Sequence, residues 1–242
     1  MESQNIYDNE AFFREYSNLR ARDDNHNVLI EQPAMAKLLP SLDGKKVLDL
    51  GCGMGENCMD FARRGAERVL GIDISKRMLA VARERTADPR VEYRCMSMED
   101  LAEIDESFDL IYSSLAFHYI EDLDSLLGEI RRHLRPGGML LFSQEHPLNT
   151  AQGHFERDEQ GNCTAYTVYD YNRASKIVTT WFVDGVEKYH RPMGQILTSL
   201  AHTGFIMEDV IEPVAEDWAL VKRPALIKEQ IKPCFLIVRA KI

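Results

Sequence analysis

The most constraining feature of this 242-residue sequence is a short apolar run that ends in three alternate glycines. The run Val47-Leu48-Asp49-Leu50 has the composition of a buried parallel strand, and Gly51, Gly53 and Gly55 follow it directly. Glycines at this spacing let the chain turn sharply from a strand into a helix and let a ligand approach the backbone N–H groups. The stretch therefore predicts a strand, a turn and a helix with a ligand at the turn; a tight turn without a ligand is the simpler alternative.

A second apolar run lies about 20 residues beyond the glycines and also ends in an acid. In Val69-Leu70-Gly71-Ile72-Asp73, the last residue falls where a strand-end carboxylate binds ribose hydroxyls in dinucleotide-type folds. Glu56 stands in place of the last glycine of the dinucleotide fingerprint, and Asp49 adds a second carboxylate beside the turn. Two carboxylates would repel a pyrophosphate and suit a ligand with a positive end. They favour S-adenosylmethionine (SAM) over NAD or FAD.

The ordered set of motifs resembles that of class I, Rossmann-like methyltransferases, in the broad group that includes ubiquinone and menaquinone biosynthesis methyltransferases. Val47–Gly55 and Gly71–Ser75 are similar to the SAM-binding segment of that family. Ser107–Ile111 and Leu134–Gly138 resemble its later signatures, so the match runs from residue 44 or so to residue 145 or so. The resemblance implies an enzyme that transfers a methyl group from SAM to a small-molecule acceptor and releases S-adenosylhomocysteine.

Composition and charge limit the class of protein and its partners. Apolar residues make up 45% of the chain and charged residues 28%, as in ordinary soluble globular proteins. The net charge of −10 argues against a nucleic-acid or anionic-membrane partner. The five cysteines include no C-x-x-C pair, which fits free thiols in a reducing compartment and offers no metal-ligand spacing. No apolar run reaches membrane length, so we expect a cytoplasmic protein, monomer or homodimer, without a metal.

Hydrophobic periodicity predicts an α/β fold with a Rossmann-like, doubly wound and mostly parallel sheet. Strands are expected at 46–50, 68–72, 91–95, 108–113 and 138–143, and helices near 55–65, 75–86 and 122–134. A helix at 193–203 and strands at 205–211 and 234–240 follow. By the resemblance, these last two strands close the sheet as an antiparallel hairpin.

We expect one methyltransferase domain over residues 1–242, built in four parts. They are an N-terminal helical cap (1–43), a SAM-binding core (44–144), a β-rich insertion after the fifth strand (145–191) and the C-terminal part of the sheet (192–242). The cap is predicted as two helices with Asp8 or Asn9 at its start. In the insertion, strands are expected at 164–171 and 176–183, with Asp184-Gly185 as a turn before 186–190.

By the resemblance, the glycine turn and the ends of the strands form the cofactor site. Asp49, Gly51, Cys52 and Gly53 are expected at the methionine half of SAM, and Asp73 at both ribose hydroxyls. In such sheets ligands bind at the carboxyl ends of the strands. Asp49, Asp73, Ser97 and Ser113 fall at predicted carboxyl ends, so one ligand could touch all four.

Further cofactor contacts are expected from four other segments. Tyr16 and Arg20 share one helical face and are candidates for the methionine carboxylate, although a solvated arginine is as good an explanation. Ile74 and Met78 are expected to pack on the adenine, and core packing is the alternative for these two. Ser97, Met98 and Glu99 follow the third strand, where the family commonly has an acid that reads the adenine amino group. Ser97 replaces that acid, so the Met98 backbone or the Glu99 carboxylate could serve instead. Leu115, after the fourth strand, is expected beside the sulfonium.

Three histidine positions are candidates for proton transfer. His118 follows the fourth strand, and a neutral histidine can take a proton near pH 7. Glu145-His146 lies at the end of the fifth strand, and His190 precedes a helix. A single histidine is more often a structural hydrogen-bonding residue than a catalyst. Methyl transfer from SAM mainly requires that a nucleophile be held in line and that water be excluded.

The aromatic residues of the insertion are candidates for the substrate pocket. We expect Tyr166, Tyr169, Trp181, Tyr189 and the adjacent His190 to include pocket residues, and packing of the hairpin on the sheet is the alternative. Three rival functions remain open at this stage. One is a nicotinamide oxidoreductase on the same type of fold, and another is a SAM-binding protein without catalysis. The third is a protein or RNA methyltransferase, although the net charge argues against RNA and the covering insertion argues against a large protein substrate.

Overall fold

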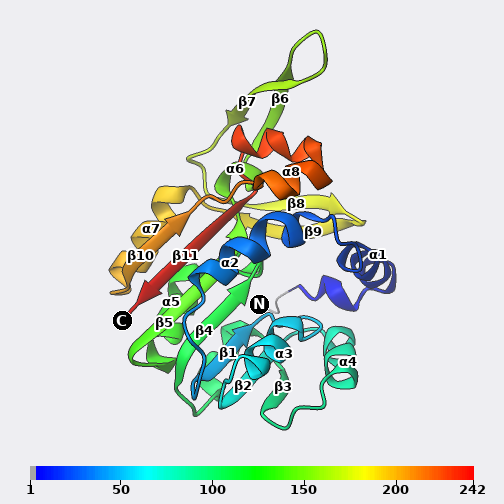
Figure 1. Cartoon of the computed structure of the whole chain (residues 1–242). Helices are drawn as coiled ribbons and strands as arrows, with labels where there is room; N and C mark the ends of the chain where they lie inside the picture. The colour runs from blue at the N-terminus through cyan, green and yellow to red at the C-terminus, as the bar shows by residue number, and fades with distance from the viewer. Residues whose placement is uncertain (1–3) are drawn as a thin grey trace.

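The computed structural model describes residues 4–242 and has a seven-stranded sheet at its centre (Figure 1). The strand order is β10-β11-β5-β4-β1-β2-β3, and β11 runs antiparallel to both of its neighbours. The strands β1 to β5 are parallel. The predicted Rossmann-like sheet with an antiparallel closure is therefore confirmed. Its strands are β1 (Lys46–Leu50), β2 (Arg68–Asp73), β3 (Val91–Cys95), β4 (Phe108–Ser114), β5 (Leu134–Glu145), β10 (Ile206–Ile211) and β11 (Phe235–Lys241).

Helices cover both faces of the sheet. The helices α5 (Leu123–His133) and α7 (Met193–His202) pack on one face, together with the short η3 (Met98–Glu103). The helices α3 (Glu56–Arg63) and α4 (Lys76–Arg85) pack on the other. Each α-helix of this group begins and ends within three residues of its predicted bounds. The β5 strand begins earlier than predicted, because Pro136–Gly138 forms an irregularity within it where the pairing with β4 changes register.

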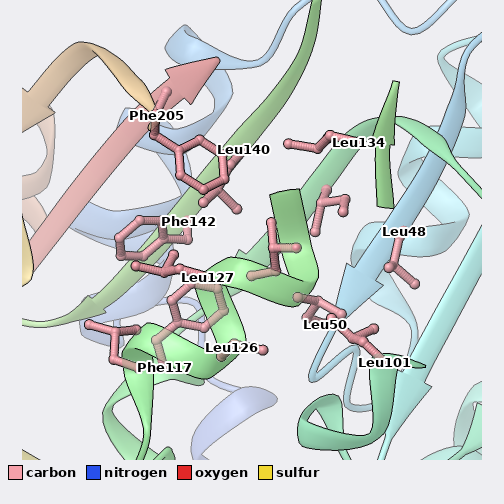
Figure 2. Close-up of a cluster of buried hydrophobic side chains, with 14 of the residues drawn as sticks. Leu48, Leu50, Leu101, Phe117, Leu126, Leu127, Leu134, Leu140, Phe142 and Phe205 are labelled. Carbon is pink, nitrogen blue, oxygen red and sulfur yellow. The ribbon is translucent and has the colours of Figure 1, made fainter. Parts of the chain in front are cut away.

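The larger core cluster fills the space between the sheet and α5 (Figure 2). Leu48 and Leu50 point into it from β1, Phe142 from β5, and Leu126 and Leu127 from α5. All five side chains are buried. Val47 instead belongs to the cluster under α3, as the alternation of side chains along a strand requires. This alternation also directs Asp49 toward α3.

The N-terminal segment packs over the carboxyl edge of the sheet. Asn9 begins its first α-helix, since the Asn9 side chain accepts a hydrogen bond from the backbone N–H of Phe12 at 3.1 Å. The ring of Phe12 meets Trp181 of the insertion edge to face, with centroids 5.3 Å apart. The elements are η1 (Ile6–Asp8), α1 (Glu10–Arg20), the π-helical η2 (Asn27–Glu31) and α2 (Gln32–Leu38).

The insertion forms two separate hairpins, of which the first projects away from the sheet in Figure 1. The strand at 152–157 lacks a clear sequence signal, and it pairs with the predicted strand that follows it. The predicted turn at Asp184-Gly185 is wrong. The chain turns at Phe182, and these two residues lie opposite Thr180 as a bulge in the next strand. The elements are α6 (Pro147–Thr150), β6 (Gln152–Arg157), β7 (Cys163–Tyr169), β8 (Ser175–Trp181) and β9 (Val183–His190).

The segment between β10 and β11 is helical rather than irregular. It contains α8 (Asp217–Lys222) and η5 (Pro224–Gln230) and lies against the first hairpin (Figure 1). Lys228 and Lys232 from this segment lie over the ring of Phe155 in β6. Within residues 4–242, no helix has both the length and the apolar character needed to cross a membrane.

Two glycine-to-alanine substitutions test how tightly the core is packed near the glycine turn. A Cβ atom at Gly71 would lie 2.8 Å from Cys58 Sγ and 2.9 Å from Cys52 Sγ. We expect Gly71→Ala to lower the free energy of unfolding by about 1–3 kcal/mol, because these buried atoms would have to move. Gly128→Ala in α5 is the control, with no atom within 4 Å of the added Cβ. Higher helix propensity should raise its stability by about 0.5–1 kcal/mol. Urea unfolding measures the free energy of unfolding of both variants. The same change in Gly71→Ala and Gly128→Ala would contradict the packing argument.

Candidate active site

A cavity of about 580 Å³ opens at the carboxyl edge of the parallel strands. Its floor is made by the glycine turn after β1 and by the ends of β2 and β4. Its cover comes from three segments that are far apart in sequence, namely the N-terminal cap, the β8–β9 hairpin and the stretch from η5 to β11. The volume is within the range of pockets that hold a small-molecule ligand.

The glycine turn allows a ligand close to the backbone. Gly51, Gly53 and Gly55 have φ angles of 74°, 54° and 77°, a region that side-chain-bearing residues rarely adopt. A Cβ atom at Gly51 would lie 2.8 Å from the Cβ of Ala116 across the turn. The N–H groups of Gly51 and Cys52 both donate to the Ile72 carbonyl at 2.9 Å. The turn therefore provides room, but these N–H groups are not free for a phosphate.

Asp73 lies at the cavity wall and holds the turn in place. Its two oxygens accept hydrogen bonds from the backbone N–H groups of Gly53 (2.9 Å) and Ser75 (2.8 Å). Burial raises the pKa of Asp73, although these two N–H donors act in the opposite direction. Each carboxylate oxygen can accept a second hydrogen bond. The side chain is therefore able to receive a ribose hydroxyl at each oxygen.

The predicted residues of α1 face the same cavity. The Arg20 guanidinium pairs with the carboxylate of Glu56 at the start of α3, and the two side chains both line the cavity. The Tyr16 ring packs edge to face on Trp181, with centroids 5.9 Å apart. In the sequence, Glu56 stands out only as a departure from the dinucleotide fingerprint. The structure makes it the ionic partner that orients Arg20.

Six further predicted cofactor residues also line the cavity. Ser97 begins η3, where its hydroxyl accepts from the Glu99 N–H at 3.1 Å, and Met98 reaches back toward Gly51. Leu115 turns the chain after β4 with a φ of 55°. The six residues are Cys52, Ile74, Met78, Ser97, Met98 and Leu115.

Three predicted cofactor residues do not line the cavity. Asp49 is fully buried under the turn, because the pleat of β1 directs it toward α3, where the Cys58 thiol donates to it at 3.3 Å. Burial raises its pKa to about 7. Ser113 is also fully buried and donates to the Leu50 carbonyl at 2.8 Å. The Glu99 side chain is exposed. The expectation that Asp49 and Ser113 touch the same ligand as Asp73 is therefore corrected.

His118, Glu145 and Lys188 form a buried polar group in the cavity wall. The Lys188 ammonium pairs with Glu145 Oε1, and His118 Nε2 lies 3.7 Å from the same oxygen. The second oxygen, Glu145 Oε2, accepts from Asn149 at 3.0 Å. The sequence predicts Glu145 and His118 in this site, whereas Lys188 carries no signal beyond its position in a strand.

The hydrogen bonds of His118 determine which of its nitrogens carries the proton. Nδ1 accepts from the backbone N–H of Glu145 at 3.3 Å, so the neutral ring carries its proton on Nε2, facing the carboxylate. Burial lowers the pKa of His118 to about 4, outweighing the opposite effect of Glu145. A ring whose lone pair is already used, and whose pKa is this low, is poorly suited to act as a general base near pH 7.

The other predicted histidines have structural partners outside the cavity. His146 Nδ1 accepts from the Leu148 N–H at 3.0 Å at the start of α6, and Nε2 lies 2.6 Å from Glu212 Oε1. The buried His190 ring lies 2.8 Å from both the Thr150 hydroxyl and the Tyr171 carbonyl. These contacts explain their burial without a catalytic role.

The predicted substrate aromatics divide in the same way. Trp181 lines the cavity, between α1 and Lys188. Tyr166 packs on Phe155 in the first hairpin, and Tyr169 is half exposed. The Tyr189 hydroxyl donates to Glu121 at 3.3 Å on the outer side. The geometry therefore places only Trp181 of these four aromatics in the cavity wall.

Several cavity residues have no signal in the sequence, because distant segments deliver them. His26, Glu229 and Cys234 form a cluster whose ligand-type atoms lie within 4.8 Å of one another. His26 Nδ1 lies 3.3 Å from an Arg223 nitrogen, which can only donate, so Nε2 carries the proton and faces Glu229 at 3.4 Å. In this arrangement Nε2 has no lone pair for a metal ion. The other cavity residues of this kind are Tyr7, Tyr119, Asn149, Phe155, Lys228, Lys232 and Phe235.

Comparison with known proteins identifies the family. A family model described as a methyltransferase domain matches residues 48–142. The crystal structure of an S-adenosylmethionine-dependent methyltransferase from Mesorhizobium loti is 36% identical, with a TM-score of 0.83, over 93% of this chain and 100% of that one. The chain belongs to the SAM-dependent methyltransferases. The predicted enzyme class and cofactor are thereby confirmed.

Two relatives show how far this methyltransferase resembles curated proteins. A Haemophilus influenzae protein, whose description gives no activity, is 40% identical over 221 residues, 88% of this chain and 87% of that protein. The ubiquinone biosynthesis O-methyltransferase of Sinorhizobium medicae is 40% identical over 104 residues, which is 42% of each protein. The resemblance to the ubiquinone group therefore covers less than half of either chain.

The cavity fits the cofactor of this family. The acid at the end of β2 has an oxygen for each ribose hydroxyl, and the apolar side chains of Ile74, Met78 and Met98 are placed for the adenine. Arg20 and the open glycine turn suit the charged methionine end. The sequence predicts two carboxylates, Asp49 and Asp73, that would distinguish this site from a pyrophosphate site. Asp49 is buried and does not line the cavity, so of these two only Asp73 does so.

The protonation of His118 gives a pH prediction. We expect the His118 imidazole to stay neutral in the folded methyltransferase down to about pH 4, while the unfolded chain takes up the proton near pH 6.5. Between about pH 6.5 and pH 4, the unfolded state therefore binds more protons than the folded state. The contribution of neutral His118 to the free energy of unfolding is fully present above pH 6.5, and it is lost as the pH falls toward 4. The loss approaches about 3 kcal/mol.

NMR titration of the imidazole and urea unfolding at several pH values measure the two effects. His118→Asn assigns the resonance and removes this contribution, so the difference between wild type and variant isolates it. An imidazole that titrates near pH 6.5 in the folded protein would contradict the buried, neutral assignment.

Proposed function

We propose that this methyltransferase acts on a small molecule that enters the cavity beside the cofactor. The observation that supports this most directly is the continuity of the cavity, which extends from Asp73 and the glycine turn to Trp181 and the η5–β11 wall. In its cover, the N-terminal cap contacts both other segments, Trp181 of the β8–β9 hairpin through Phe12 and Tyr16, and Glu229 of η5 through His26. A covered cavity of this size suits a small acceptor better than a segment of a large protein.

The residues of the chain mainly position the reactants. SAM supplies an electrophilic methyl group on sulfur when bound. Asp73 and Arg20 would hold its ribose and methionine ends, and Leu115 and Ala116 lie across the turn from Gly51, where the reactive end would lie. Trp181, Phe12 and Tyr16 form an aromatic cover that would exclude water from the reaction. Holding two reactants in line accounts for a large share of such catalysis.

Among the residues that the structure describes, neither of the predicted bases that line the cavity, His118 and Glu145, is free to act as a strong base. His118 uses its lone pair on the Glu145 backbone, and the Glu145 carboxylate is surrounded by Lys188, Asn149 and His118. Although burial alone raises the pKa of Glu145, the Lys188 ammonium and the hydrogen bond from Asn149 bring it below its ordinary value. We therefore expect an acceptor that loses its proton easily, or one with a nucleophilic atom that carries no proton.

Parts of the chain beyond the family match determine the acceptor. The match to the methyltransferase domain ends at residue 142, before the insertion and the η5–β11 segment that form the far wall. The activity of the Sinorhizobium medicae relative, which covers 42% of this chain, therefore indicates the kind of reaction and leaves the acceptor open.

Calorimetric titration with S-adenosylhomocysteine tests the assigned cofactor contacts. Asp73→Asn should lower the affinity by at least about tenfold, because it removes the charge from hydrogen bonds to the ribose worth about 1.5–3 kcal/mol. Asp49→Asn is the matched control. It changes the same chemical group in the neighbouring strand, but its side chain lies under the turn, so we expect an affinity within about threefold of wild type. Equal losses in both variants would overturn the assignment.

A second pair of variants tests the aromatic cover. Methyl transfer from labelled SAM to a pool of small molecules identifies an acceptor, for which kcat/KM is then measured. Trp181→Ala should lower kcat/KM by about tenfold or more, because it removes a ring that closes the cavity. Tyr189→Phe should leave it within about twofold, because that hydroxyl faces Glu121. A loss in Tyr189→Phe alone would reverse the roles assigned to the two sides of the hairpin.

A further inference from the structure

Given the small-molecule transfer proposed above, the far wall of the cavity determines what the acceptor carries. This wall comes from η5, which contributes Lys228 and Glu229, and from the connection between η5 and β11, which contributes Lys232 and Cys234. Phe155 of the first hairpin faces the two lysines. None of these residues belongs to the cofactor end of the cavity, where Asp73 and Arg20 lie.

The two lysines differ from the other cations of the cavity. Arg20 is paired with Glu56, and Lys188 is paired with Glu145. In the described part of the chain, neither the Lys228 nor the Lys232 ammonium has a carboxylate oxygen within 4.0 Å. A cation that lines a covered cavity without a direct ion pair is able to bind an anion.

Both ammonium groups lie near aromatic rings of the first hairpin, and that of Lys232 also makes a hydrogen bond. The Lys232 ammonium donates to the Asn149 side chain at 2.6 Å and lies 5.2 Å from the centroid of the Tyr166 ring. The Lys228 ammonium lies 5.7 Å from the centroid of Phe155. Burial lowers the pKa of Lys232, which shows that its charge lacks full solvation. An anion bound here would restore that stabilisation.

Glu229 adds an acceptor of hydrogen bonds beside the lysines. Its side chain is 3% exposed, and Oε1 faces His26 Nε2 at 3.4 Å. Its second oxygen, Oε2, has no nitrogen or oxygen donor among residues 4–242, and the only other donor to this carboxylate is the thiol of Cys234, a weak one. A buried carboxylate oxygen without a donor is costly, and a ligand hydroxyl or amine would satisfy it. With two lysines and one glutamate, this wall has an excess of one positive charge.

We propose that the acceptor of this methyltransferase carries a carboxylate, which Lys228 and Lys232 bind, and a neighbouring hydroxyl or amine, which donates to Glu229. One carboxylate balances the excess charge of the wall, whereas a phosphate would exceed it. The aromatic rings of Phe155 and Phe235 border the same space and suit an apolar body on the acceptor. The carboxylate is the anchoring group, and the methylated atom lies toward the glycine turn.

Binding to the protein loaded with S-adenosylhomocysteine tests the proposal without turnover. The probe is mandelate, which has a ring, a hydroxyl and a carboxylate, and mandelamide differs from it mainly in charge. We expect mandelate to bind about tenfold or more tightly than mandelamide, by calorimetry. In the double variant Lys228→Gln and Lys232→Gln, mandelate should lose about tenfold in affinity and mandelamide little.

The control is the double variant Lys45→Gln and Lys76→Gln. It removes the same total charge from exposed positions that do not line the cavity, so mandelate affinity should not change. The proposal is overturned by equal binding of acid and amide, by unchanged mandelate affinity in the cavity variant, or by no mandelate binding at millimolar concentration. Tighter binding of phenyl phosphate than of mandelate would overturn the choice of carboxylate.

Each protein is first titrated with S-adenosylhomocysteine. This titration separates failure of the carboxylate site from failure of the small-molecule methyl transfer on which it rests. Normal loading with no preference for the acid rejects the carboxylate site and leaves the small-molecule methyl transfer standing. Failure of the wild-type protein to bind S-adenosylhomocysteine would instead count against the cofactor contacts on which both depend. We expect the cavity lysines not to affect loading, because they come from η5 and the connection after it, whereas the assigned cofactor contacts come from α1 and the ends of the parallel strands.

Discussion

The carboxylate of Asp73 is the group on which the rest of the site depends. It ends β2, accepts from the Gly53 N–H in the neighbouring turn, and accepts from the Ser75 N–H at the start of α4. The Ser75 hydroxyl donates in turn to Asp8 of the N-terminal cap at 2.7 Å, and Asp8 also accepts from the backbone of Arg77. One acid at a strand end therefore connects the glycine turn, a helix and the cover. The shape of the cofactor site and the position of its cover are consequently set together.

The sequence predicts most of the central sheet because its signals are local. The strands β1, β2 and β4 contain short apolar runs, whereas β3 alternates apolar and charged residues, and each of the four ends within one residue of its predicted position. Tyr16 and Arg20 were also correctly placed together, since helical spacing alone puts them on one face. The first hairpin strand, 152–157, was missed because nearly all of its side chains are exposed, so it lacks the alternation that marks a half-buried strand.

The errors at the site arise where long-range packing decides. Asp49 and Asp73 look equivalent as acids beside a glycine turn, but Asp49 lies inside β1, and the pleat buries it against Cys58. Asp73 is the last residue of its strand and so reaches the cavity. The charge argument for SAM was therefore right about the ligand and wrong about one of its two acids. Glu229 and Lys232 could not be predicted, because a segment near the C-terminus brings them to the cavity through tertiary contacts alone.

The cover of the cavity is held by two kinds of contact with different physical properties. Trp181 meets α1 through aromatic contacts, which tolerate small shifts because they depend weakly on direction. Lys188, seven residues further on, is tied to Glu145 by a buried ion pair, and removing one partner of such a pair costs about 3–5 kcal/mol. His118 does not replace the lysine, since burial keeps its ring neutral near pH 7. The β9 strand is therefore fixed to the end of β5. The N-terminal cap is fixed to the cofactor side of the site, because Asp8 accepts from Ser75 and Arg20 pairs with Glu56. The two sides of the cavity are thus held by separate polar contacts, and the aromatic contacts of Trp181 join them.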